Sequence, residues 1–106
     1  MRMEFVETNV FTERISKLLT DDEYYDLQAV LAENPKAGDV IPGAGGLRKL
    51  RWHRRGRGKR GGLRVIYYCW SEARLYMIFV YDKTEQGDLT AEQLRMLRAY
   101  VKGGVL

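Results

Sequence analysis

Apolar side chains recur at helical spacing in the N-terminal third of the chain. A short apolar stretch at 3–7 predicts a strand, and a helix is expected to follow, capped by Thr8 or Asn9. A second helix is expected to open with the capping box of Thr20 and Glu23 and to end near residue 34, because the residue before a proline avoids the helical region. The inward residues are predicted to be Phe5, Phe11, Ile15, Leu18, Leu19, Tyr24, Leu27, Val30 and Leu31.

The middle of the chain changes to the alternating pattern of strands. A glycine-rich loop at 42–46 leads into three predicted strands at 47–53, 63–70 and 75–81. Short connections between consecutive strands favour an antiparallel meander, and the segment 54–62 is expected to be a loop because no apolar period survives in it. Thr90 and Gln93 then form another capping box, which predicts a last helix with Leu94, Leu97 and Val101 inward.

These elements predict an α+β fold in one domain spanning residues 1–106. We expect a small antiparallel sheet of about four strands, with two N-terminal helices and a C-terminal helix packed on one face. The opposite face is then expected to be open. Lys49, Arg51 and His53 share one face of their strand, and Tyr81 and Lys83 share a face of theirs.

Charge distribution adds a functional signal to this outline. The 32 residues from Val40 to Ser71 hold nine Lys and Arg and no acidic residue, whereas the remainder of the chain is net −5. Such an asymmetry favours a polyanionic partner, since each phosphate neutralised by Lys or Arg releases counterions. The glycine-rich part of the basic segment does not match a nucleotide-binding P-loop, because it lacks the Gly-Lys-Ser/Thr ending and runs into a strand.

Composition limits the chemistry that the chain can carry. Cys69 is the only cysteine, so no internal disulfide can form, and with His53 as the only histidine neither a Cys/His metal site nor a histidine acid–base pair can be assembled. No signal peptide or membrane-spanning stretch is recognisable, and we expect a cytoplasmic protein without a cofactor. A metal-free attack on RNA would have to use Lys, Arg and Tyr, with arginine holding the negative charge of the transition state.

Three motifs in order along the chain resemble a known family. They are Gly45-Gly46-Leu47-Arg48-Lys49, then Gly58-Lys59-Arg60-Gly61-Gly62 followed by Leu63-Arg64-Val65-Ile66-Tyr67-Tyr68, and finally Tyr81-Asp82-Lys83. Together they resemble the RelE/HigB superfamily of bacterial toxins, most closely its HigB-type branch. The resemblance covers essentially the whole chain.

The resemblance implies an endoribonuclease that cuts messenger RNA in the A site of the 70S ribosome and stops translation. It also implies metal-free attack of the 2′-hydroxyl on the adjacent phosphate, which leaves a 2′,3′-cyclic phosphate. A cognate antitoxin, expected to be a helix-turn-helix protein, would bind and block the toxin.

Residue roles follow from the same resemblance. Arg64 matches the family's transition-state arginine, Lys59 is the candidate base or charge stabiliser, and Arg60 is expected to orient phosphate. Lys83 is the candidate acid or second phosphate ligand, and Tyr81 either acts on the leaving group, stacks on a base or belongs to the core. Docking to ribosomal or messenger RNA is expected of Arg48, Lys49, Arg51, Arg54, Arg55 and Arg57. Trp52, Tyr67, Tyr68, Trp70 and Phe79 are expected in the core.

Two other function classes stay open at this point. The same basic surface would serve a non-catalytic nucleic-acid-binding module, or a toxin of the related ParE kind that poisons gyrase. The presence of Arg64 and Lys83 favours catalysis over the first alternative, and the dense basic glycine loop favours a ribonuclease over the second.

Overall fold

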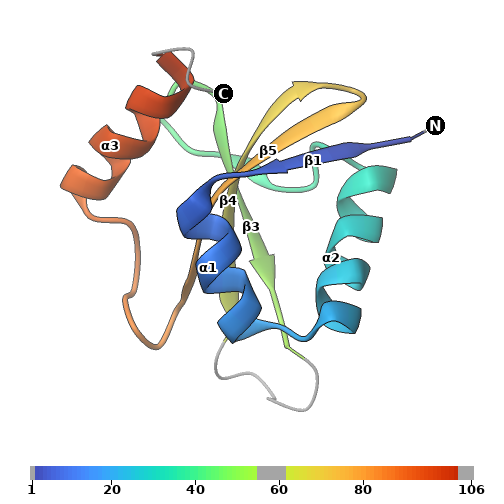
Figure 1. Cartoon of the computed structure of the whole chain (residues 1–106). Helices are drawn as coiled ribbons and strands as arrows, with labels where there is room; N and C mark the ends of the chain where they lie inside the picture. The colour runs from blue at the N-terminus through green and yellow to red at the C-terminus, as the bar shows by residue number, and fades with distance from the viewer. Residues whose placement is uncertain (1, 55–61, 103–106) are drawn as a thin grey trace.

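The computed structural model describes residues 2–54 and 62–102. A five-stranded sheet has the order β1-β5-β4-β3-β2, with three helices in the described ranges (Figure 1). The elements are β1 Glu4–Glu7, α1 Asn9–Leu18, α2 Asp21–Glu33, β2 Asp39–Val40, β3 Leu47–Trp52, β4 Leu63–Ser71, β5 Arg74–Asp82 and α3 Ala91–Lys102. The α+β class is therefore confirmed. The five strands are close to the predicted number of about four, with a two-residue β2 at one edge. The purely antiparallel sheet is corrected, because β1 pairs in parallel with β5.

The helix caps follow the predicted chemistry. The Thr8 side chain accepts a hydrogen bond from the Phe11 amide at the start of α1, and Thr20 and Glu23 close a complete capping box on α2. Thr90 and Gln93 exchange two bonds of 3.0 Å in the same manner before α3. Each box satisfies amide groups that the first helical turn leaves without intrahelical partners.

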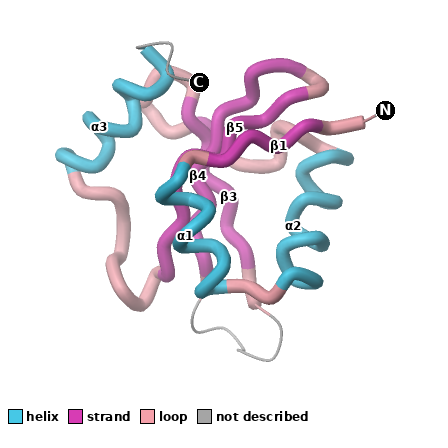
Figure 2. The backbone as a smooth tube through the Cα atoms, in the orientation of Figure 1, coloured by secondary structure: helices cyan, strands magenta, loops and turns pink. Residues whose placement is uncertain are grey.

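Both faces of the sheet are covered, which corrects the predicted position of the last helix. Phe11, Ile15, Leu27 and Leu31 pack from α1 and α2 onto one face, against a core that includes Val65. Leu97 of α3 packs onto the opposite face, against a second core. Figures 1 and 2 show α3 standing apart from the α1–α2 pair. The face predicted to be open is thus partly closed by α3 and by the segment around Ala44.

Two inward predictions are also wrong at single residues. Val30 of α2 is 41% exposed and Trp70 of β4 is 59% exposed. Trp70 lies at the end of its strand, with its ring edge-on to Tyr76 at a centroid distance of 6.1 Å. Strand alternation places a side chain on a face but does not show where along the strand the covering layer stops.

Tyr67 ties the turn after α2 to the central strand. Its hydroxyl donates to the Pro35 carbonyl at 2.8 Å and accepts from the Gly38 amide at 2.9 Å. Burial raises the pKa of Tyr67, although the Gly38 hydrogen bond opposes the shift. The hydroxyl therefore stays protonated and able to fill both roles.

Replacing Tyr67→Phe is expected to lower the free energy of unfolding by about 1–3 kcal/mol, because the buried Gly38 amide loses its partner. Urea unfolding followed by circular dichroism measures the change. Tyr25→Phe is the matched control, since Tyr25 is 71% exposed, and it should stay within about 0.5 kcal/mol of the wild type. Equal stability of the two variants would contradict the role given to the Tyr67 hydroxyl.

Candidate functional site

A row of three side chains crosses the centre of the sheet on the α3 face. Arg64 of β4 is paired directly with Arg51 of β3 on one side and with Tyr81 of β5 on the other. Cross-strand partners point to the same face of a sheet, so strand register alone brings these three groups together. We call Arg51, Arg64 and Tyr81 the central row. Alternation within β4 left the face of Arg64 open, and the pairing with its neighbours resolves it.

Arg64 carries a buried positive charge. It is only 8% exposed, and its Nη1 donates to the Leu63 carbonyl at 3.3 Å. Among residues 2–54 and 62–102, Arg64 forms no ion pair with a carboxylate. Burying an unpaired charge is costly, so an anion bound beside this guanidinium would relieve the cost.

The single histidine lies beside Arg64. A methyl group built on Gly62 would stand 3.4 Å from Arg64 Nη1 and 3.6 Å from His53 Nδ1, so both side chains border this glycine. The amide of Lys83 donates to the Gly62 carbonyl at 2.9 Å, which brings the turn after β5 to the same place. Arg64, His53 and the backbone of Lys83 therefore meet around Gly62, whereas the Lys83 side chain is exposed to solvent.

Tyr81 is fully buried, which excludes base stacking on its ring in this conformation. Its hydroxyl donates to Asp88 Oδ1 at 3.4 Å, and the same oxygen accepts from Lys49 Nζ at 3.4 Å. Burial first, and then the Asp88 charge, raise the pKa of Tyr81 to about 12, with the nearby Arg64 charge acting in the opposite direction. The Tyr81 hydroxyl therefore stays protonated at neutral pH and donates a hydrogen bond to Asp88.

Asp88 was not anticipated from the sequence. A hydrogen bond from the Leu89 amide is the main cause that lowers its pKa, with Lys49 and Tyr81 adding to the effect. The carboxylate therefore stays ionised and holds Lys49 beside the central row. This role is seen only in the contacts that Asp88, between β5 and α3, makes with Lys49 and Tyr81. No local sequence motif indicates it.

Two of the predicted docking arginines have structural partners. Arg48 projects to the other face from Arg64, where its Nη1 donates to the Gly38 carbonyl at 2.7 Å. Arg54 forms an ion pair with Asp82, and both side chains are nearly buried. Arg51 and Lys49 remain on the face of the central row. Arg55, Arg57, Lys59 and Arg60 lie outside the described residues.

Asp82 anchors Arg54, which follows β3, to the turn after β5. Burial would raise the pKa of Asp82, but hydrogen bonds from the Thr84 amide and hydroxyl and the charge of Arg54 outweigh it and lower the pKa. The Thr84 bonds measure 2.8 and 2.7 Å. The carboxylate accepts from both sides, so it joins the end of β3 to the end of β5.

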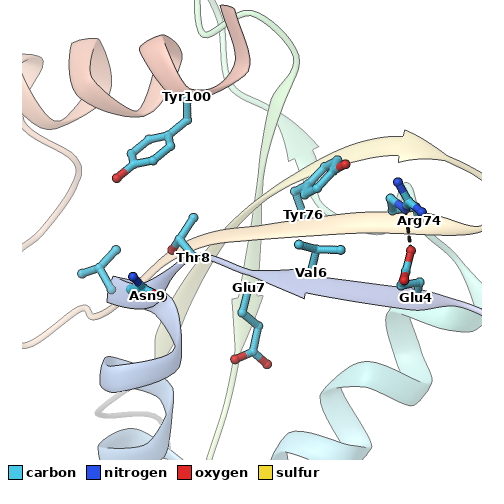
Figure 3. Close-up of a pocket in the computed structure, with 9 residues that line it drawn as sticks. Glu4, Val6, Glu7, Thr8, Asn9, Arg74, Tyr76 and Tyr100 are labelled. Carbon is cyan, nitrogen blue, oxygen red and sulfur yellow. Dashed lines mark hydrogen bonds and ion pairs between the residues drawn. The ribbon is translucent and has the colours of Figure 1, made fainter. Parts of the chain in front are cut away.

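The largest hollow among those described is remote from this row. It has a volume of about 560 Å³ and lies between β1 and the end of α3, where Figure 3 shows Tyr100, Tyr76 and the Glu4–Arg74 ion pair. None of the central-row side chains lines it. In residues 2–54 and 62–102, no group of three or more His, Cys, Asp or Glu is arranged to hold a metal ion. No helix in those ranges is long and apolar enough to cross a membrane.

Comparison with known proteins agrees with the fold. Residues 8–104 match the family described as the RelE toxin of the RelE/RelB toxin–antitoxin system. Because the match spans most of the chain, the protein belongs to this toxin family. Its structure is similar to that of an arginine-to-alanine double mutant of E. coli toxin RelE in the free state, with a TM-score of 0.56 and 15% sequence identity over 82% of this chain and 90% of the other.

Changing Asp82→Asn is expected to destabilise the protein by about 1–3 kcal/mol at pH 7, because the bonded charge is lost. A carboxyl group whose pKa is lowered in the folded state stabilises the protein at pH values above its ordinary pKa of 3.8. That contribution disappears as the pH falls through the lower pKa of the folded state. The stability difference between wild type and variant should therefore shrink towards pH 2–3. Denaturant unfolding at several pH values measures it, and a pH-independent difference would contradict the assigned charge state.

Proposed function

We propose that this RelE-family toxin is a ribosome-dependent endoribonuclease that cleaves messenger RNA in the A site and inhibits translation. The observation that carries the proposal is the buried guanidinium of Arg64, which has no carboxylate partner among the described residues and sits between Arg51 and Tyr81. Such a group suits a pentacoordinate phosphate, whose extra negative charge appears only in the transition state.

The proposed reaction needs no metal ion. The 2′-oxygen attacks the adjacent phosphorus, the bond from phosphorus to the 5′-oxygen breaks, and a 2′,3′-cyclic phosphate and a 5′-hydroxyl result. A base removes the 2′-hydroxyl proton, and an acid supplies a proton to the departing 5′-oxygen. Arg64 stabilises the phosphoryl charge. Lys59 is proposed as base or charge stabiliser, Arg60 as phosphate ligand, and Lys83 as acid or second phosphate ligand.

The structure changes the roles that we propose for several of the predicted residues. Tyr81 is given a supporting role within the sheet rather than a role in stacking on a base, since it is fully buried and bonded to Asp88. Arg51, with Arg55 and Arg57, is proposed to dock RNA backbone. Arg48 and Arg54 are given structural roles, because their guanidinium groups are held by the Gly38 carbonyl and the Asp82 carboxylate.

We also propose a partner and a family branch for this chain. The family description couples the toxin RelE to RelB, which supports an antitoxin as the partner of this chain. A helix-turn-helix antitoxin, a cytoplasmic location and membership of the HigB-type branch remain parts of the proposal. The branch assignment rests on the Gly58–Gly62 motif of the sequence.

Arg64→Ala is expected to reduce the single-turnover rate of mRNA cleavage on programmed ribosomes by about 10²-fold or more, while ribosome binding falls little. The reason is that the guanidinium acts on charge that develops only in the transition state. Primer extension of the cleaved message and a pelleting assay for ribosome binding give the two quantities. Arg98→Ala, an exposed position on α3, is the control and should cleave as the wild type does.

Parallel loss of cleavage and binding in Arg64→Ala would reduce Arg64 to a docking residue. Absence of cleavage by the wild type itself would remove the enzymatic proposal and leave a binding module or a gyrase-directed toxin.

His53→Gln is expected to lower the cleavage rate by less than about tenfold. We assign proton transfer to lysines, and this imidazole only helps to shape the site. The pH dependence of the rate gives a second readout. A lysine base keeps the rate rising above pH 7, whereas an imidazole base would make the rate level off at a lower pH than a lysine does. A plateau of that kind, lost in the variant, would transfer the role of base to His53.

A further inference from the structure

A second hollow adjoins the central row on the α3 face. It has a volume of about 330 Å³ and lies between β2, β3 and the segment leading into α3. Its walls include apolar side chains of Ile41, Pro42, Leu89 and Leu94 together with charged groups from the two strands. The size falls at the lower end of the range of about 300–1,000 Å³ that small-molecule pockets show. An apolar slot with a few charged groups suits a flat, polar-edged ligand.

Asp39 brings an available carboxylate to this hollow. It is the direct cross-strand partner of Lys49, so it stands on the same sheet face as the central row. Lys49 is already bound to Asp88. Within the two described ranges the Asp39 side chain forms no hydrogen bond or ion pair, and its carboxylate oxygens are therefore able to accept hydrogen bonds from a ligand.

The hollow is joined to Arg64 along two paths. Arg51 lines the hollow and is also the cross-strand partner of Arg64. Asp88 lines it from the other side and accepts the hydrogen bond of Tyr81, which is the second partner of Arg64. A nucleotide whose phosphate lies between Arg51 and Arg64 can therefore direct its base into the hollow.

We propose that this hollow is a nucleobase subsite, in which the Asp39 carboxylate accepts a hydrogen bond from the exocyclic amino group of an mRNA base next to the scissile phosphate. The apolar walls cover the faces of the base, and Arg51 binds the attached phosphate. Uracil is disfavoured, because it presents carbonyl oxygens where cytosine carries an amino group, and a carboxylate repels them. The inference rests on the proposed ribonuclease function and adds base selection to it.

Binding of mononucleotides to the isolated toxin tests the subsite directly. The probes are 5′-CMP against 5′-UMP and 5′-AMP against 5′-IMP, two pairs that differ by an amino group in place of a carbonyl. NMR titration of the labelled protein is expected to show roughly tenfold tighter binding of the amino member of at least one pair, with shifts at Asp39 and Leu89, as expected for one charge-assisted hydrogen bond. Equal affinities within both pairs would overturn the proposal.

Asp39→Asn supplies the second test, because an amide can donate to a carbonyl oxygen. The variant is expected to lose the preference for CMP over UMP and to shift mapped cleavage sites on programmed ribosomes towards uracil at the affected position. Glu33→Gln removes the same charge from an exposed position at the end of α2 and should change neither result. An unchanged cleavage pattern in Asp39→Asn would contradict base reading by this carboxylate.

The two proposals fail in different ways. A wild-type toxin that cleaves mRNA, with an Asp39→Asn pattern identical to its own, retains the nuclease and removes the subsite. A wild-type toxin that cleaves nothing removes the nuclease, and the subsite with it. If Asp39→Asn does not fold, the nucleotide pairs measured on the wild type still decide the question.

Discussion

The pairing register of β4 with its two neighbours is the constraint on which the site depends. Arg64 lies in the central strand, so its side chain can reach neither edge of the sheet and takes its environment from β3 and β5. The register places Arg51 and Tyr81 directly beside it. A shift by one residue would turn Arg64 towards the core beneath α1 and α2, where no charge could be accommodated. The strand pairing that forms the sheet therefore also assembles the central row.

Carboxylates are distributed so that they restrain cations around Arg64 without pairing with it. Asp82 holds Arg54, and Asp88 holds Lys49 and the Tyr81 hydroxyl. Each acid fixes a neighbour in place. None of the described acids forms an ion pair with the guanidinium at the centre, so no bound carboxylate offsets its charge. This arrangement explains how a short acid-free stretch of sequence can coexist with acidic residues close to it in space.

Local patterns predicted most elements, but long-range placement escaped them. The capping boxes at Thr20 and Thr90 announced two helices correctly. Amphipathic spacing in α3 showed that Leu97 is buried without showing which sheet face buries it. The two-residue β2 is too short for any periodicity. The pairing of Arg48 and Arg54 with distant groups could not be inferred, because charge counts show how many cations exist and not which are already bound.

Arg54 and Gly62 flank residues 55–61, and both are bonded to the turn that follows β5, one through Asp82 and the other through the Lys83 amide. The ends of the segment are thus positioned by groups outside it. Closure of a chain between fixed ends depends only weakly on the number of residues enclosed. Because the folded sheet fixes both ends, a change in the number of residues between them is expected to cost little stability.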